Sequence, residues 1–380
     1  MDVFHFYSSK KSVLALILAI SVLLVNSQDA KATQYVFSDL GTVQGDLAGF
    51  GVNAYAINNH GQVVGNDSTT AYTWINGIAS TLPSLTGADL TSAQAINDAG
   101  QVIGGDYHIA IDRGYPLRWD GQTLTSLSTL DGYISSAIAI NNAGQIGGAS
   151  WLSTSFMPVR WDGDAITPLE TLGGNSGAVG GINEAGLLVG QSAIVDDEAN
   201  HATLWLGTAA TDLGTAGGSG STAIDINNLN QIVGWGNVLG DQHSHALLWD
   251  GLNANPQDLG TLGSVNLNSA AQAINDDGTI IGWSELEGGE MHAVSWSNGL
   301  TLTDLNQFLP DDLGQDGWYL QLALGVNNRG DIVGILANRN NADLTAAFEL
   351  KAVPLPGAVW LFGSVLAGFC AHKRQKALGV

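Results

Sequence analysis

The sequence predicts an all-β protein, a seven-bladed β-propeller of four-stranded blades that its N-terminal strand closes. A motif of the type AINDDGTIIGWS (residues 273–284) occurs seven times. Each copy reads as four short strands in roughly the length of one propeller blade, about 40 to 45 residues. The last copy lacks its fourth strand, and a matching segment precedes the first copy. A linear β-solenoid is the main competing architecture, but it does not need complementary ends.

The first and second strands of each copy are joined by a turn that begins with an asparagine. A glycine follows three residues later in six copies, and Asn230 replaces it in the fifth; another glycine follows the first asparagine by seven residues in every copy. Because asparagine is the non-glycine residue that best tolerates a left-handed backbone, we expect a positive φ at the position of Asn230. Flanking aliphatic residues predict two strands joined by a four-residue loop with a bulge. Asn-Gly chemistry alone would explain one turn but not seven in register, so we assign structural turns to Asn58, Asn97, Asn141, Asn183, Asn227, Asn275 and Asn327.

The third strand of each copy carries an aromatic residue, and a fourth strand follows a second tight turn. Stretches such as HALLWDG (245–251) and PVRWDG (158–163) show this pattern. The aromatic residues are Trp74, Trp119, Trp161, Trp205, Trp249, Trp296 and Phe348. The predicted fourth strands include 125–130, 167–172, 211–216 and 257–262.

The two ends of the repeat region complement each other. The last copy stops after its third strand, at 346–350, whereas YVFSDLGTV at 35–43 precedes the first turn and contains the DLGT also found at 212–215 and 258–261. We therefore expect the N-terminal strand to complete the last blade, which leaves no free sheet edge. Fifty glycines, eight prolines and a hydrophobic content of 45 % suit many short strands around a sizeable core.

The N-terminal segment predicts export. Two lysines, Lys10 and Lys11, precede an apolar run, and Ala30-Lys31-Ala32 offers a small-x-small cleavage site. Residues 1–32 are therefore predicted to be a secretory signal peptide, with an uncleaved anchor helix as the alternative. The predicted propeller domain spans residues 33–350.

Residues 351–380 are predicted to be a C-terminal sorting signal. The apolar run at 357–371 is short for a membrane span, which takes ~20 residues, and a basic cluster follows it. Because basic residues stay on the cytoplasmic side, the repeat domain is expected outside, held by a transient inner-membrane anchor. Cys370 lies in this run, so no disulfide forms within one chain. We interpret Cys370 as a membrane-facing residue, with lipidation as the alternative.

The C-terminal segment resembles the PEP-CTERM sorting signals of Gram-negative bacteria. The resemblance implies processing by an exosortase-type membrane enzyme and a role in the export of exopolysaccharide-associated proteins. Leu355 stands where the family name has a glutamate, which leaves the processing point open. The residues that carry the resemblance are Val353, Pro354, Leu355, Pro356, Trp360, Leu361, Phe362, Gly363 and Ser364, with the basic end after them.

The repeats resemble HAF-type extracellular repeats over most of residues 35–350. The His-Ala-Phe element is present at His201, His245 and His292, each followed by alanine, with the phenylalanine replaced. Neither family implies a catalytic residue. Equivalent positions in successive blades distribute these histidines around the ring, so we do not expect a zinc site.

The charge excludes some partners. The chain has a formal net charge of −23, and removal of residues 1–32 and of everything after Pro356 leaves six basic and 33 acidic residues, a net of −27. Such a surface repels nucleic acid and anionic lipid and attracts divalent cations.

The loops between second and third strands vary most, and in a propeller they share one face. Trp151, Trp235 and Trp283 follow second strands and are candidate sugar-stacking residues, with interblade packing as the alternative. The candidate binding cluster, with calcium as its candidate cofactor, consists of Asp196, Asp197 and Glu198.

Two functional classes remain. The favoured one is a secreted, monomeric, non-catalytic module that binds exopolysaccharide or a surface protein in a biofilm matrix. The alternative is a secreted polysaccharide hydrolase or lyase, which needs paired carboxylates across a pocket. The loop carboxylates considered for such a pair are Asp106, Asp112, Asp196, Asp197, Glu198, Asp241, Glu285, Glu287 and Glu290, whereas Asp276 and Asp277 lie in the turns of the opposite face and are interpreted as structural.

Overall fold

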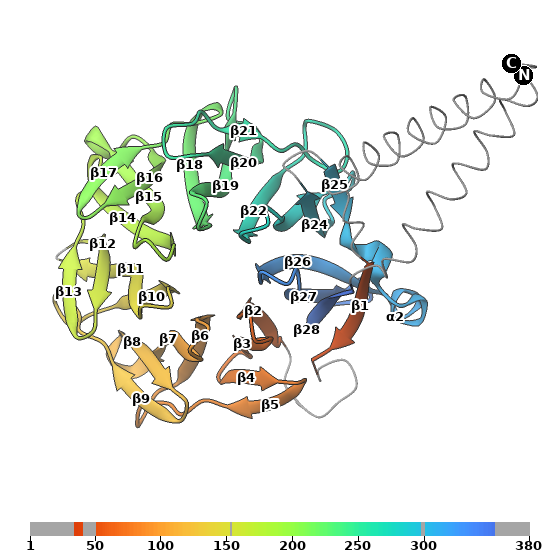
Figure 1. Cartoon of the computed structure of the whole chain (residues 1–380), viewed down its shortest axis with the longest axis horizontal. Helices are drawn as coiled ribbons and strands as arrows, with labels where there is room; N and C mark the ends of the chain where they lie inside the picture. The colour runs from red at the N-terminus through yellow and green to blue at the C-terminus, as the bar shows by residue number, and fades with distance from the viewer. Residues whose placement is uncertain (1–33, 41–50, 153, 298–300, 354–380) are drawn as a thin grey trace, which may run out of the picture. The chain divides into compact units, whose positions relative to one another are not determined.

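Seven four-stranded antiparallel sheets are arranged as blades in a ring (Figure 1), which confirms the predicted seven-bladed β-propeller. The computed structural model describes residues 34–40, 51–152, 154–297 and 301–353. Residues 37–351 form one compact unit. In the part of the chain that is described, no helix has the length and apolar character needed to cross a membrane.

Six blades use four consecutive strands. The first three blades are β2 (Asn53–Ile57), β3 (Gln62–Asn66), β4 (Ala71–Ile75) and β5 (Ile78–Thr81); β6 (Leu90–Ile96), β7 (Gln101–His108), β8 (Arg113–Asp120) and β9 (Thr123–Ser126); β10 (Ser135–Ile140), β11 (Gln145–Leu152), β12 (Ser155–Asp162) and β13 (Ala165–Pro168). The next three are β14 (Gly173–Ile182), β15 (Leu188–Ile194), β16 (Asn200–Leu206) and β17 (Ala209–Asp212); β18 (Gly217–Ile226), β19 (Gln231–Val238), β20 (Ser244–Asp250) and β21 (Gln257–Asp258); β22 (Ser269–Ile274), β23 (Ile280–Glu285), β24 (Met291–Ser297) and β25 (Thr301–Asp304).

The seventh blade joins the two ends of the repeat region. It consists of β26 (Trp318–Val326), β27 (Ile332–Asn338), β28 (Asn341–Val353) and the N-terminal β1 (Gln34–Asp39), which lies beside β28. The pairing continues past β1, because the Leu40 N–H donates to the Ala347 carbonyl at 3.3 Å. The predicted closure by the N-terminal strand is confirmed.

The turn between the first two strands is built by its asparagine. In the first blade, the Asn58 carbonyl accepts the Gly61 N–H at 3.0 Å, and Asn58 Oδ1 accepts the backbone N–H groups of His60 and Gln62 at 3.0 and 2.9 Å. Gly61 has a φ of +77°, and Asn230 at the same position of the fifth blade has +63°. The expected left-handed backbone is therefore confirmed.

These turn asparagines also connect the blades to one another. Each one is buried, and its Nδ2 donates to the carbonyl of the turn asparagine in the next blade. The last bond, from Asn327 Nδ2 to the Asn58 carbonyl at 3.1 Å, returns to the first blade. The ring runs Asn58 to Asn97 (3.0 Å), Asn97 to Asn141 (3.1 Å), Asn141 to Asn183 (3.1 Å), Asn183 to Asn227 (3.3 Å), Asn227 to Asn275 (3.0 Å) and Asn275 to Asn327 (3.0 Å).

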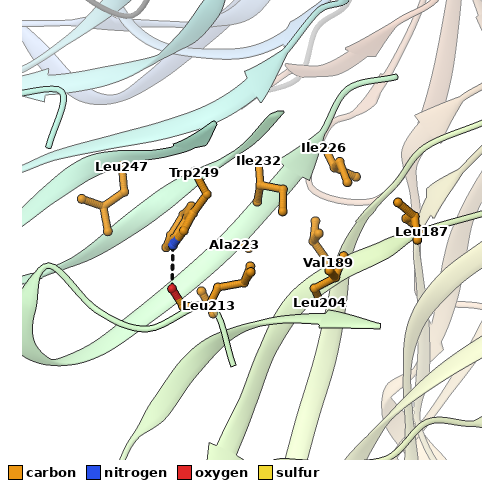
Figure 2. Packing of buried hydrophobic residues seen from close by; sticks show 10 residues of the cluster. Leu187, Val189, Leu204, Leu213, Ala223, Ile226, Ile232, Leu247 and Trp249 are labelled. Atoms are coloured by element: carbon orange, nitrogen blue, oxygen red, sulfur yellow. Dashed lines mark hydrogen bonds between the residues drawn. The ribbon is translucent and has the colours of Figure 1, made fainter. Parts of the chain in front are cut away.

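The tryptophans of the third strands tie six of the blades to the segment that precedes each of them; the seventh blade has Phe348 at this position. Trp249 is fully buried, and its indole N–H donates to the Leu213 carbonyl at 2.9 Å, among apolar side chains of the fourth and fifth blades (Figure 2). Trp74 makes the equivalent bond to the Leu40 carbonyl at 2.8 Å, which fastens the N-terminal strand to the first blade. The core therefore lies between neighbouring sheets.

The predicted fourth strands were placed too late in the sequence. In the fourth blade β17 ends at Asp212, and Leu213 belongs to the connection that follows. Leu213 is buried, and its N–H donates to the Ala202 carbonyl of β16 at 2.9 Å. The same displacement occurs at β9 and β13, whereas β21 begins at residue 257 as predicted and ends four residues early. The alternating pattern continues past the strand because the connection also buries a leucine.

The glycine seven residues after each turn asparagine allows close approach between two strands. A Cβ atom on Gly104 would lie 1.9 Å from the Ser92 carbonyl oxygen, and one on Gly234 would lie 2.0 Å from that of Thr222. Real Cβ atoms do not approach backbone this closely, so only glycine fits there.

Candidate functional site

A pocket lies beside the connection between the sixth and seventh blades. This connection departs from the repeat, because it contains the short helices η3 (Leu305–Phe308) and α2 (Asp311–Gln315). The cavity has a volume of about 390 Å³. We call it the seam pocket. It is lined by Asn306, Leu309, Pro310, Asp311, Gly314, Gln315, Trp318 and Arg339.

Hydrogen bonds hold the wall of the seam pocket in place. Asp304 ends β25 and accepts the Asn306 N–H at 2.9 Å, which caps η3. Asn306 in turn exchanges two hydrogen bonds with Leu320 of β26: its Nδ2 donates to the carbonyl at 2.9 Å, and its Oδ1 accepts the N–H at 2.8 Å. The non-repetitive connection is thus fixed to the seventh blade.

Arg339 follows β27 and is held on two sides. Its Nε and Nη2 donate to the two carboxylate oxygens of Glu290 at 2.8 and 2.7 Å, a bidentate ion pair. Its guanidinium carbon lies 4.6 Å from the ring centroid of Tyr319. The hydrogen bonds from Arg339 lower the pKa of the Glu290 carboxyl, and the same pair raises the pKa of Arg339.

His292 lies between two carboxylates. Its Nδ1 is 2.8 Å from Asp304 Oδ2, and its Nε2 is 2.8 Å from Glu290 Oε1. Burial disfavours the charged imidazolium, but the hydrogen bonds and charges of both carboxylates outweigh it and raise the pKa of His292. For Asp304, burial favours the neutral acid, but hydrogen bonds from His292 and the Asn306 N–H outweigh it and lower the pKa. Acceptors on both ring nitrogens suit a protonated imidazole.

The pairing of histidine with aspartate repeats in the two preceding blades. His201 contacts Asp212 at 2.8 Å, and His245 contacts Asp258 at 2.7 Å, in both cases through Nδ1 and Oδ2. The histidines belong to successive third strands, β16, β20 and β24, so the structure does not gather them. Their aspartate partners were not predicted, although each of these histidines is followed by an aspartate, Asp212, Asp258 or Asp304, at a similar distance along the chain. Among these three pairs, only that of the sixth blade also contacts Glu290, with Tyr319 and Arg339 supplied by the seventh blade.

The three tryptophans selected from the sequence lie in separate sheets. Trp151 is at the end of β11 and packs edge-on against Phe156, with ring centroids 5.0 Å apart. Trp235 pairs with Ala246 inside the fifth blade, and Trp283 with Ala293 inside the sixth. None of the three lines the seam pocket, where Trp318 supplies the aromatic surface instead.

The acidic cluster selected from the sequence is an exposed connection. Asp197 accepts hydrogen bonds from the backbone N–H and from the Nδ2 of Asn175, at 2.7 Å each, and so fastens this loop to β14. Asp196 has a φ of +67°, and Glu198 is exposed. Among the described residues, no three histidine, cysteine, aspartate or glutamate side chains form a group that would hold a metal ion. The calcium hypothesis therefore receives no support from the positions of these residues.

The axis of the ring carries a second polar ring, formed by the residues that follow the turn asparagines. Asp276 Oδ1 accepts the Asn228 N–H at 2.9 Å, and its own N–H donates to Asn328 Oδ1 at 2.9 Å. Asp98 and Glu184 occupy equivalent places and accept the N–H groups of Asn59 and Asn142. The axial cavity has a volume of about 260 Å³. Asp276 thus contributes to turn structure, and Asp277 lies in the same turn.

One carboxyl near the axis was missed. Asp225 of β18 accepts the N–H groups of Ile226 and Ile274 at 2.8 and 2.9 Å. Burial raises its pKa to about 6, with a further contribution from the charge of Asp276. The signal was present in the repeat, because the other six blades have a small residue at this position: Ala56, Ala95, Ala139, Gly181, Ala273 and Gly325.

The export signals lie outside the described residues, except that Val353 ends β28. This holds for the predicted signal peptide 1–32 and for Cys370. It also holds for the sorting-signal residues Pro354, Leu355, Pro356, Trp360, Leu361, Phe362, Gly363 and Ser364.

Solved propellers are similar to this chain in fold. The WD40 repeats of RRP9 match with a TM-score of 0.54 at 12% identity, covering 84% of this chain and 100% of that one. The β-propeller domain of the Trilobed protease from Pyrococcus furiosus, described as having an open velcro topology, matches with a TM-score of 0.52 at 12% identity over 80% and 97%. A catalytically inactive virginiamycin B lyase from Staphylococcus aureus matches with a TM-score of 0.50 at 11% identity over 84% and 100%. No family model and no curated protein matches the chain. These similarities establish the β-propeller scaffold.

Proposed function

We propose that this protein is a secreted, non-catalytic binding module that takes a glycan in the seam pocket. The observation that carries the proposal is the pocket itself, whose lining includes an aromatic residue, Trp318, together with the polar residues Asn306, Gln315, Asp311 and Arg339. Glycan sites need an aromatic surface for the apolar face of the sugar and polar groups for its hydroxyls. The pocket is built from a connection that departs from the repeat, so it is a local feature of one seam.

The terminal sequences support the proposed location. The predicted signal peptide and the resemblance to PEP-CTERM signals favour export from a Gram-negative cell, with an exosortase-type enzyme as the processing partner. The resemblance to HAF-type repeats favours an extracellular role. We propose that the propeller acts at the cell surface or in the biofilm matrix and that exopolysaccharide, or a surface protein, is its partner.

The alternative is a polysaccharide hydrolase or lyase. One observation favours it: His292, Glu290 and Asp304 place an imidazole between two carboxylates beside the seam pocket. Binding is the better supported function, because these groups are already engaged with one another and Glu290 is held by Arg339. A general acid or base must have a proton position within reach of substrate.

Glycan-array binding by the full-length chain in mild detergent tests the proposal. The wild type should bind a defined set of glycans, and Trp318→Ala should lose at least ~90 % of that binding, as expected for a stacking contact of about 1.4 kcal/mol or more. Gln315→Ala, on an exposed helix, should weaken binding without disturbing the fold. Trp151→Ala is the matched control and should bind as the wild type does.

Two results would overturn the proposal. Equal binding by Trp318→Ala, Gln315→Ala and the wild type would show that the seam pocket is not the glycan-binding site. Release of cleaved product from a bound glycan, abolished by Glu290→Gln or Asp304→Asn, would establish the enzyme instead.

A further inference from the structure

The cations of the propeller are already engaged within the protein. Across the described ranges there are six lysine and arginine residues, against an acidic majority that gives the whole chain its charge of −23. Arg113 donates to the Gly132 carbonyl and lies over the Tyr133 ring, 4.8 Å from its centroid. The other five form ion pairs: Arg118 with Asp120 (3.0 Å), Arg160 with Asp162 (2.7 Å), Arg329 with Asp331 (2.6 Å), Arg339 with Glu290 (2.7 Å) and Lys351 with Glu349 (3.3 Å).

In the seam pocket, too, the arginine of the lining is already bound by groups of the protein. Arg339 lines it, but its Nε and Nη2 donate to the two carboxylate oxygens of Glu290, and its guanidinium carbon lies 4.6 Å from the ring centroid of Tyr319. A carboxylate on a ligand would have to compete with this bidentate pair. Asp311, by contrast, places an exposed carboxylate on the same wall, and Trp318 adds an aromatic ring. A carboxylate and an aromatic face are the two groups that recognise an ammonium ion.

We propose that the ligand of the seam pocket is an amino-bearing glycan, a polysaccharide whose hexosamine units carry free primary amines, and not a uronate-rich one. This inference rests on the proposed glycan-binding function. The ammonium group lies between the Asp311 carboxylate and the Trp318 ring, while Gln315 binds hydroxyls. Asn306 Nδ2 already donates to Asp304 and Leu320, so Asn306 contributes only its Oδ1 as an acceptor for a hydroxyl.

The net negative charge of the whole molecule also favours an amino-bearing glycan over a uronate-rich one. A strongly acidic surface attracts a polycationic chain and slows the approach of a polyanionic one. Salt weakens this attraction, since the Debye length falls from about 10 Å at 0.1 M to about 3 Å at 1 M. The preference for an amino glycan is therefore expected to decrease with ionic strength, while stacking on Trp318 persists.

Calorimetric titration of the full-length chain in mild detergent with three oligosaccharides of equal length tests the inference. These are an N-acetylated hexosamine oligomer, its de-N-acetylated form and a uronate oligomer. The de-N-acetylated oligomer should bind about tenfold more tightly than the acetylated one at low salt, as a carboxylate and cation–π contact imply. The uronate oligomer should bind most weakly.

Asp311→Asn should remove the preference for the amine and keep binding of the acetylated oligomer. Asp312→Asn is the matched control on the same helix; Asp312 accepts the Leu313 N–H at 3.0 Å and does not line the pocket, so the preference should remain. Tighter binding of the acetylated or uronate oligomer, or an unchanged preference in Asp311→Asn, would overturn the amino-glycan inference alone. Absence of binding to all three, together with a silent glycan array, would overturn the proposed function as well.

Discussion

Asp225 provides a sharp test of how the ring is stabilised. It carries a carboxyl into a position that the other six blades fill with alanine or glycine, and burial raises its pKa from 3.8 to about 6. The unfolded chain releases this proton near pH 3.8 and the folded chain near pH 6. Below pH 3.8 the carboxyl is protonated in both states and does not lower the free energy of unfolding. Between the two pKa values the free energy of unfolding falls as the pH rises, and the loss is nearly complete above about pH 6.

The size of the effect follows from the two pKa values. A difference of about two units corresponds to a penalty on the order of 3 kcal/mol at pH 7, of which about 2 kcal/mol develops between pH 4.5 and pH 7. Asp225→Asn and Asp225→Ala abolish the ionisation. Each also changes the hydrogen bonds to Ile226 and Ile274, but that change is independent of pH.

Urea unfolding of the full-length chain, followed by tryptophan fluorescence, measures the difference between variant and wild type. The free energy of unfolding of both variants should rise relative to that of the wild type by about 2 kcal/mol between pH 4.5 and pH 7. A difference that stays constant, or that falls as the pH rises, would refute the assignment of a destabilising carboxylate at Asp225.

Three further predictions concern stability. Asn327→Ala removes the donor from the seventh blade to the Asn58 carbonyl, which keeps the Gly61 N–H, and it leaves two backbone N–H groups without their acceptor. Denaturant titration should therefore show a loss of about 2 to 4 kcal/mol, against less than about 1 kcal/mol for the exposed Asn328→Ala. Trp249→Phe removes the bond to Leu213 and should cost about 1 to 2 kcal/mol, whereas Trp249→Ala should cost about 3 to 5 kcal/mol; equal losses would contradict the packing described. The raised pKa of His292 implies stability that is fully present below about pH 6.5 and is lost as the pH rises through the folded-state pKa. His292→Gln should flatten that part of the stability profile, and an unchanged profile would contradict the clamp by its two carboxylates.

The fold was predictable because its signal is repeated. Seven turn asparagines in register determine the number of blades. The last copy lacks its fourth strand, and an extra strand precedes the first copy, so the two ends together predict closure of the ring. The substitution of Asn230 for glycine predicted a left-handed backbone, and its φ of +63° agrees. The fourth strands were misplaced because Leu213 and its equivalents extend the alternating pattern into a buried connection. Burial alone does not distinguish a strand from such a connection.

The candidate site was less predictable, because it depends on where the repeat is interrupted. Trp318, Gln315 and Arg339 come together through the pairing of β26 with β27 and through the fold of residues 305–317. Tryptophans chosen by their position after second strands, such as Trp283, instead occupy places set by the sheet. The available signal was the departure from the repeat before Trp318, which marks an insertion with its own structure.

The hydrogen bonds of Asp225 and of the histidine and aspartate pairs illustrate a second limit. These hydrogen bonds form between groups that come together only after neighbouring strands or blades have packed. The bond from the Ile274 N–H to the Asp225 carboxylate, which joins two blades, is an example. A comparison of the seven copies does reveal that Asp225 is exceptional, but only the structure shows which N–H groups it binds.

The most direct test of the account is a crystal structure of the protein with a bound hexosamine oligosaccharide. We expect a sugar ring on the Trp318 side chain, with its amine beside Asp311 and its hydroxyls within hydrogen-bonding distance of Asn306 and Gln315. A sugar bound at Trp151, Trp235 or Trp283, with the seam pocket empty at saturating ligand, would contradict it.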